Sequence, residues 1–232
     1  MGALNDATLT HTMPDYGNTA SLSNTSLMPQ ITWRWVTERG LRVDTGALTL
    51  ARYHALVGAA LDEVEAIIPA DGSLLVVLHP GASPSRRLQT LLTADVPVAI
   101  DAPGRVHELL VDYGGVAGQD LAAVAEGAGL SLAAAIALHS SATYRVLFLG
   151  FQPGFAYLEG TPHTLHQPRL SRPRAQIPAG SLAIGGAYTG IYPSTGPGGW
   201  NLIGRVEAKL FNPHREPPAL LMPGDQVRFV VL

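Results

Sequence analysis

Glycine and proline are concentrated in residues 150–205, which hold 18 of the chain's 43 glycine and proline residues. Glycine permits positive φ angles and close backbone approach, whereas proline fixes φ and removes a hydrogen-bond donor. The gaps hold large ring side chains rather than the serines and charges of a flexible linker. These rings are Phe151, Phe155, Tyr157, Tyr188, Tyr192 and Trp200. The pattern predicts a sharply folded, ordered wall of the kind that carries binding sites.

Composition excludes several classes of function. The length of 232 residues allows one large or two small domains, and the 47% hydrophobic content is enough for a buried core. A net charge of −3 gives no electrostatic reason to expect nucleic acid or an anionic membrane. No run of about 18 apolar residues is present, so we expect no membrane span. The lack of cysteine excludes disulfides and cysteine nucleophiles and fits a cytoplasmic protein.

The N-terminal third divides into two predicted regions. Residues 1–30 are polar and without apolar periodicity, and we predict a disordered extension. The first lysine or arginine of the chain is Arg34, so the positively charged region that begins a signal peptide is missing. Residues 31–101 are predicted to form a small α+β sandwich: strands within 31–44, a helix over 48–64, two strands joined at 70–72, and a helix capped by Ser83 or Ser85. We expect no chemistry in that domain.

Residues 102–232 are predicted to form a closed or nearly closed β-barrel. Many short strands with glycine and proline corners are typical of that architecture. The alternating run 105–113 predicts a strand, and two short helices follow, the second capped by Ser131. A buried strand over 143–150 leads into the glycine- and proline-rich wall. Residues 223–225 form a turn before a closing strand.

Several catalytic classes are excluded by missing residues. The chain has one lysine, Lys209, and no Gly-x4-Gly-Lys-Ser/Thr motif, so it has no self-contained P-loop. The same observation argues against Ser-Ser-Lys amidase and Schiff-base chemistry. A Gly-x-Ser-x-Gly nucleophile elbow is absent as well.

Three histidines are candidates for chemistry. His163 and His166 have metal-pair spacing, but proline flanks them and no supporting ligand motif is near, so we predict no metal site. His139 lies at the end of the second barrel helix, where the helix C-terminus favours the protonated ring. It is either a capping residue or a catalytic or ligand-binding residue.

Arginines and glycines of the wall suggest an anion site. Arg169 and Arg174 each follow a proline, and guanidinium suits bidentate recognition of carboxylate or phosphate. The alternatives are salt bridges to Asp225, Glu159 or Glu207, or an interface with another protein. The amides of Gly198 and Gly199 can point at an anion beside Tyr157, Tyr192 and Trp200; alternatively they form a tight turn with Trp200 as a core plug. Arg205 completes the predicted anion-binding set.

These residues also carry a family resemblance. The segments GFQPGFAYLEG, PRLSRPR, IPAGSLAIGG, TGIYPSTGPGGWNLIGR and PGDQVRF resemble the signature series of the 5-oxoprolinase B-subunit family, formerly labelled allophanate hydrolase subunit 1. The resemblance covers residues 31–232. It implies a cyclophilin-like barrel after a small α+β domain.

The resemblance implies one component of a multi-subunit enzyme. A B subunit of this family pairs with a C subunit of similar barrel fold and with an A subunit. The complex opens 5-oxoproline to glutamate with hydrolysis of ATP, which requires Mg²⁺. Arginines and oriented amides would stabilise charge on phosphoryl and amide oxygens. We therefore expect His139 and Arg174 as catalytic candidates.

Two other functions stay open. The family includes a sporulation kinase inhibitor, so the chain is alternatively a binding module that docks on a histidine kinase through an exposed apolar patch. A role in allophanate or urea metabolism is the third hypothesis. This chain has no amidase signature or biotin-attachment motif for those reactions.

Overall fold

The computed structural model describes residues 32–95 and 104–232. The predicted extension over residues 1–30 and the predicted domain boundary at 101/102 lie outside the described residues. Within the described ranges, no single helix has the length and apolarity to cross a bilayer; two consecutive helices reach that length only as a pair bent by 92°.

Residues 32–95 form one four-stranded antiparallel sheet with two helices. The strand order is β1-β2-β4-β3. The elements are β1 (Thr32–Trp35), β2 (Gly40–Asp44), α1 (Thr49–Ala59), β3 (Val64–Ala70), β4 (Ser73–Leu78) and α2 (Arg86–Thr93). Ser85, one of the two serines predicted to cap this helix, accepts a hydrogen bond from the amide of Leu88 and caps α2.

One expectation for this region was wrong. The helix predicted over 48–64 ends at Ala59, because Ala60 adopts a left-handed conformation with φ of 45° and Val64 begins β3. The core of this region also holds a charged side chain, because Arg52 is fully buried and donates to the carbonyl of Leu91. Burial lowers the pKa of Arg52, and the charge of Asp95 raises it in part.

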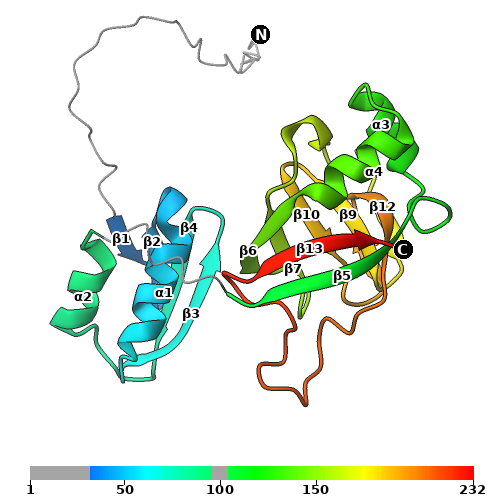
Figure 1. Cartoon of the computed structure of the whole chain (residues 1–232). Helices are drawn as coiled ribbons and strands as arrows, with labels where there is room; N and C mark the ends of the chain where they lie inside the picture. The colour runs from blue at the N-terminus through cyan, green and yellow to red at the C-terminus, as the bar shows by residue number, and fades with distance from the viewer. Residues whose placement is uncertain (1–31, 96–103) are drawn as a thin grey trace, which may run out of the picture. The chain divides into compact units, whose positions relative to one another are not determined.

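Residues 104–232 form a closed β-barrel (Figure 1) with the strand order β10-β7-β6-β13-β5-β12-β9. The strands are β5 (Val106–Tyr113), β6 (Thr143–Leu149), β7 (Ala156–Glu159), β9 (Ser181–Gly185), β10 (Tyr188–Ile191), β12 (Asn201–Val206) and β13 (Gln226–Val231). A separate two-stranded sheet pairs β8 (Arg174–Ile177) with β11 (Gly196–Gly198). The predicted α+β fold class with a C-terminal barrel is confirmed.

Helices α3 (Leu121–Gly127) and α4 (Leu132–Ser141) interrupt the barrel between β5 and β6. Ser131 caps α4 by accepting from the amide of Ala134, as the sequence predicted. The barrel interior is filled by apolar side chains from the strands and from both helices. It is therefore a packed core rather than a channel.

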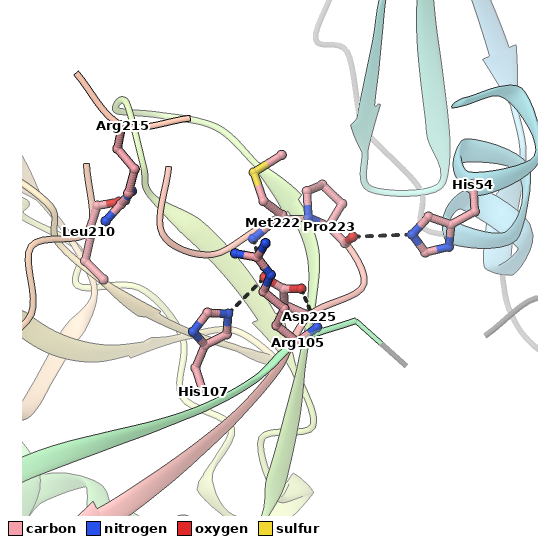
Figure 2. Close-up of polar contacts among 8 residues, drawn as sticks. All are labelled: His54, Arg105, His107, Leu210, Arg215, Met222, Pro223 and Asp225. Atoms are coloured by element: carbon pink, nitrogen blue, oxygen red, sulfur yellow. Dashed lines mark hydrogen bonds and ion pairs between the residues drawn. The ribbon is translucent and has the colours of Figure 1, made fainter. Parts of the chain in front are cut away.

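Asp225 joins the strands where the barrel closes (Figure 2). Its carboxylate accepts hydrogen bonds from the amides of Arg105 and Met222, each at 2.9 Å, and lies 3.0 Å from Nε2 of His107. Only 6% of Asp225 is exposed. Asp225 immediately precedes β13, and Arg105 immediately precedes β5, which pairs with β13 in parallel. The carboxylate thus fixes the register in which the last strand closes the barrel.

Replacing Asp225 is expected to destabilise the protein. In Asp225→Ala two backbone amides and the His107 ring lose their acceptor in a buried site, and we expect a loss of about 3 kcal/mol in the free energy of unfolding. Urea titration of the full chain measures the change. The matched control is Asp62→Ala, which removes an exposed carboxylate and should stay within about 0.5 kcal/mol of wild type. Equal stability of the two variants would contradict the role given to Asp225.

Candidate functional site

Aromatic side chains from the glycine- and proline-rich stretch gather in one cluster, here called the aromatic wall. It consists of Phe155, Tyr157, Tyr188, Tyr192 and Trp200. Phe155 touches Trp200 edge to face with ring centroids 5.3 Å apart, and Tyr157 meets Trp200 in the same way at 5.5 Å. Such tilted contacts between buried rings are favourable beyond the area that they bury. The ordered wall expected from the sequence is therefore present.

Glycine makes room for these rings. A Cβ atom added at Gly185 would lie 2.4 Å from Cδ2 of Trp200, and one added at Gly190 would lie 2.8 Å from Cζ of Phe155. At Gly198 it would lie 2.2 Å from the hydroxyl oxygen of Tyr192. Real Cβ contacts are essentially never that short, so a side chain at any of these positions would force the facing ring to shift. The glycines of the stretch serve close ring-to-backbone approach as well as turns.

Two predicted arginines converge on the wall. The guanidinium carbon of Arg169 lies 5.8 Å from the Trp200 ring centroid, within cation–π range. Burial raises the pKa of Tyr192, while a hydrogen bond with the Trp200 backbone and the charges of Arg169 and Arg174 lower it in part. Both guanidinium groups therefore act on the same phenol. The structure brings together Arg169, Arg174, Tyr157, Tyr192 and Trp200, all candidates from the sequence.

Arg174 is held by a carboxylate that sequence reasoning missed. Its Nη2 donates to Oδ1 of Asp120 at 2.7 Å, and Oδ2 of Asp120 accepts from the amide of Leu202, also at 2.7 Å. An aspartate before a helix normally caps it, but Asp120 makes no side-chain cap bond to α3. The Asp120 carboxylate instead joins the β8–β11 sheet to strand β12.

The sequence offered salt bridges from the wall arginines to Asp225, Glu159 or Glu207 as an alternative, and these predicted partners were wrong. Asp225 pairs with His107, and Glu159 pairs with Arg145 at 2.5 Å. Among the described residues, no ion pair involves Glu207. Nη1 of Arg174 is buried and finds no hydrogen-bond partner in the described part of the chain. Buried donors are nearly always paired, so this atom marks a position where an acceptor would be stabilised.

The remaining anion-binding candidates are placed differently. Gly198 lies in β11 opposite Arg174 of β8, and the carbonyl of Gly199 accepts from the amide of Leu170 at 2.7 Å. Trp200 is only 4% exposed, as the core-plug alternative expected. Arg205 lies near the far end of β12 from Trp200, about 16 Å along the strand, and its side chain is exposed. The structure does not bring Arg205 to the aromatic wall.

The loop 150–154 holds Phe151, a ring of the predicted wall that was not named as a site residue, and Gln152, which was not predicted at all. Phe151 has φ of 66°, a left-handed conformation that costs a bulky residue strain energy, and its side chain is 58% exposed. Its ring still meets Tyr192 at 6.1 Å. Gln152 accepts from the Ser194 hydroxyl at 3.2 Å.

An apolar pocket of about 480 Å³ lies beside the loop 150–154, and Phe211 also lines it. The signal in the sequence was the Gly150–Gly154 pair around a solitary phenylalanine.

His139 lies in the core of the barrel. The residue is 1% exposed; Nδ1 lies 2.7 Å from the hydroxyl of Tyr113, and Nε2 lies 3.2 Å from the hydroxyl of Thr189. Burial lowers its pKa from 6.5 to about 3. The raised proton affinity predicted from the helix C-terminus is therefore wrong, because desolvation of the charged ring outweighs the helix dipole. With both nitrogens bonded and no open surface, His139 cannot reach a substrate in this structure.

His163 and His166 lie in the short 3-10 helix His163–Leu165 and directly after it. Their ring centroids are 4.9 Å apart, and Nε2 of His166 bonds the carbonyl of Thr161 at 2.9 Å. Within residues 32–95 and 104–232, no third histidine, cysteine or acidic residue joins them in a group fit for a metal ion. Nothing in this arrangement calls for a metal.

Comparison with known proteins identifies the family. Residues 32–221 match the family model described as carboxyltransferase domain, subdomain C and D, and the chain belongs to this family. It is 54% identical over 132 residues to a protein of Escherichia coli O157:H7 named as the B subunit of 5-oxoprolinase. That match spans 57% of this chain and 61% of the relative. A protein of the same name from Haemophilus influenzae is 48% identical over 140 residues, with 60% and 65% covered.

Solved structures show the same fold. The crystal structure of TTHA0988 superposes with a TM-score of 0.71 at 41% identity, covering 84% of this chain and 40% of that one. The chain thus matches less than half of that longer polypeptide. The urea amidolyase of K. lactis superposes with a TM-score of 0.66 at 17% identity over 90% of this chain and 15% of its own. At that identity the likeness concerns the fold alone.

The aromatic wall yields a packing test. In Gly185→Ala the new methyl group would overlap the Trp200 ring, and we expect a loss of about 2 kcal/mol in the free energy of unfolding. The control is Gly58→Ala in α1, where the added Cβ meets nothing within 4 Å and should be neutral or stabilising by up to about 1 kcal/mol. Urea titration followed by tryptophan fluorescence measures both. Unchanged stability in Gly185→Ala would contradict the tight packing.

The His139 environment yields a pH test. The native pKa of about 3 lies below the unfolded value of 6.5, so between these values the unfolded chain binds a proton that the native protein does not. The His139 contribution is therefore unchanged above pH 6.5 and stability falls as the pH drops below it, by about 2 kcal/mol at pH 5. The matched variant is His139→Gln, which cannot take up the proton. Its free energy of unfolding should fall less steeply from pH 7.5 to 5; equal slopes would refute the assignment.

Proposed function

We propose that the chain is the B subunit of a cytoplasmic, ATP-dependent 5-oxoprolinase complex that opens 5-oxo-L-proline to L-glutamate together with a C subunit and an A subunit. The observation that carries the proposal is the 54% identity to a protein named as the B subunit of 5-oxoprolinase. The gathering of five predicted site residues at the aromatic wall supports it. The match spans 61% of that relative, so activity, substrate and partners are all part of the proposal.

The substrate offers chemistry that suits the aromatic wall. 5-Oxoproline is a small ring that carries one carboxylate, and ring opening develops negative charge on the amide oxygen. Arg169 is exposed and its guanidinium is free of ion pairs among the described residues, so it is proposed to receive the carboxylate. Arg174 directs its unpartnered Nη1 toward developing charge while Asp120 holds its other nitrogen.

The proposed ATP site is a property of the whole complex, because this chain has no nucleotide-binding motif of its own. ATP with Mg²⁺ supplies the free energy that hydrolysis of a stable lactam lacks. The chain has no P-loop, and its single lysine, Lys209, lies outside the wall. Phosphate contacts from this chain would therefore come from guanidinium groups and backbone amides such as those of Gly198 and Gly199.

Activity of the reconstituted complex tests the proposal. The chain, purified with its partner subunits, should hydrolyse ATP only when 5-oxoproline is present. In Arg169→Ala we expect kcat/KM for 5-oxoproline to fall by about 10- to 100-fold, since a charge-assisted contact to the carboxylate is lost. The matched control is Arg86→Ala, an exposed arginine of α2, which should leave the rate unchanged.

Two outcomes would count against it. Absence of 5-oxoproline-dependent ATP turnover in the intact complex overturns the assignment of the activity. Full activity of a folded Arg169→Ala complex leaves the activity in place but removes this arginine from the substrate site.

Asp120→Asn tests whether Asp120 positions Arg174 without touching the substrate. Because this variant loosens Arg174, it should lower kcat more than it changes KM.

A further inference from the structure

The outer face of strands β5 and β13 carries apolar side chains that the barrel does not use. Figure 1 shows the two strands side by side in the barrel wall, and their residues pair in parallel register. The inward side chains, such as Leu109 and Phe229, are buried in the barrel core. Of the outward ones, Leu110 is 56% exposed and Val230 is 40% exposed. Leu232, directly after β13, is 74% exposed.

This apolar strip is framed by charge. In the paired strands Leu110 lies opposite Val230, and one step along the same face Glu108 lies opposite Arg228. On the neighbouring strand Arg205 lies opposite Asp112. Glu108 and Arg228 are both exposed, and no ion pair within residues 32–95 and 104–232 involves either. An apolar centre with a charged rim is the usual anatomy of a protein interface.

The arrangement is complementary to itself. A two-fold axis lying in the contact plane, parallel to the strands and midway between them, places β5 of one copy over β13 of the other. Leu110 then faces Val230 of the second copy, and Glu108 faces Arg228 of the second copy. Both contacts occur twice. Aligned packing of two sheets about 10 Å apart is a common geometry and keeps these central rows opposed.

We infer that this face is a homodimer interface, with a second copy of the chain as its occupant. Leu110 and Val230 of one copy are covered by Val230 and Leu110 of the other, and Glu108 and Arg228 each face the opposite charge of the second copy. The strip is small, so we expect a dissociation constant of about 10 to 100 µM. The inference concerns assembly and does not depend on the proposed enzymatic activity.

Sedimentation equilibrium of the full chain, from about 5 to about 200 µM, tests for the dimer. The wild type should pass from monomer to dimer across this range. Leu110→Asp places an unpaired charge at the centre of the strip and should leave only monomer. The matched control is Val116→Asp, at an apolar residue that is 98% exposed outside these strands, and it should dimerise as the wild type does. A wild-type chain that stays monomeric overturns the inference and leaves the face to a different protein.

Charge reversal tests the geometry itself. In Glu108→Arg, like charges face each other across the proposed axis, and in Arg228→Glu the same holds with opposite sign; each variant alone should dimerise at least about tenfold more weakly. Mixing the two variants pairs each altered residue with an opposite charge in the other chain, so the mixture should form a heterodimer at the wild-type level. Failure of the mixture to associate, or unimpaired dimers of either variant alone, would refute the proposed pairing.

Discussion

The contact between Trp200 and the backbone of the neighbouring strand organises the candidate site. The indole ring occupies the space that a side chain at Gly185 would need, and Gly190 leaves similar space for Phe155. A buried indole contributes more apolar contact than any other side chain, but only where the backbone lets it approach. With Trp200 in place, Tyr157 packs against it edge to face and Arg169 lies over the ring. The positions of the charged groups therefore depend on glycines that carry no chemistry themselves.

A second constraint is the balance between desolvation and local dipoles inside the barrel. A helix C-terminus stabilises a protonated histidine by about 1 kcal/mol, whereas the burial that lowers the pKa of His139 to about 3 corresponds to about 5 kcal/mol. The neutral ring instead links Tyr113 to Thr189, and Thr189 contacts Thr161 at 2.9 Å. This hydrogen-bonded chain joins α4 to β5 and β10 within an apolar core. Its members are satisfied by one another, which is the condition for polar groups to be stable there.

Local features were predictable from the sequence, and long-range pairings were not. Ser85 and Ser131 cap helices as expected, because a cap depends on residues three positions apart. The gathering of Arg169, Arg174 and the rings was also predictable, since they share one dense stretch of chain. The partner of Arg174 was missed: Asp120 lies 54 residues away and resembles an ordinary helix cap. Likewise His139 was misjudged, because its burial depends on strands that close around it later in the chain.

The outer face of the barrel keeps apolar side chains that its stability does not require. Folding requires the inward residues of β5 and β13, and alternation leaves every second position free to be polar. At Glu108, Asp112 and Arg228 the outward residues are indeed charged, whereas Leu110 and Val230 are not. Exposed leucine and valine on neighbouring strands raise the risk of nonspecific association unless a partner covers them. Cover by another protein surface therefore best explains why Leu110 and Val230 are apolar. In the same way, close packing of the rings explains the glycines of the aromatic wall.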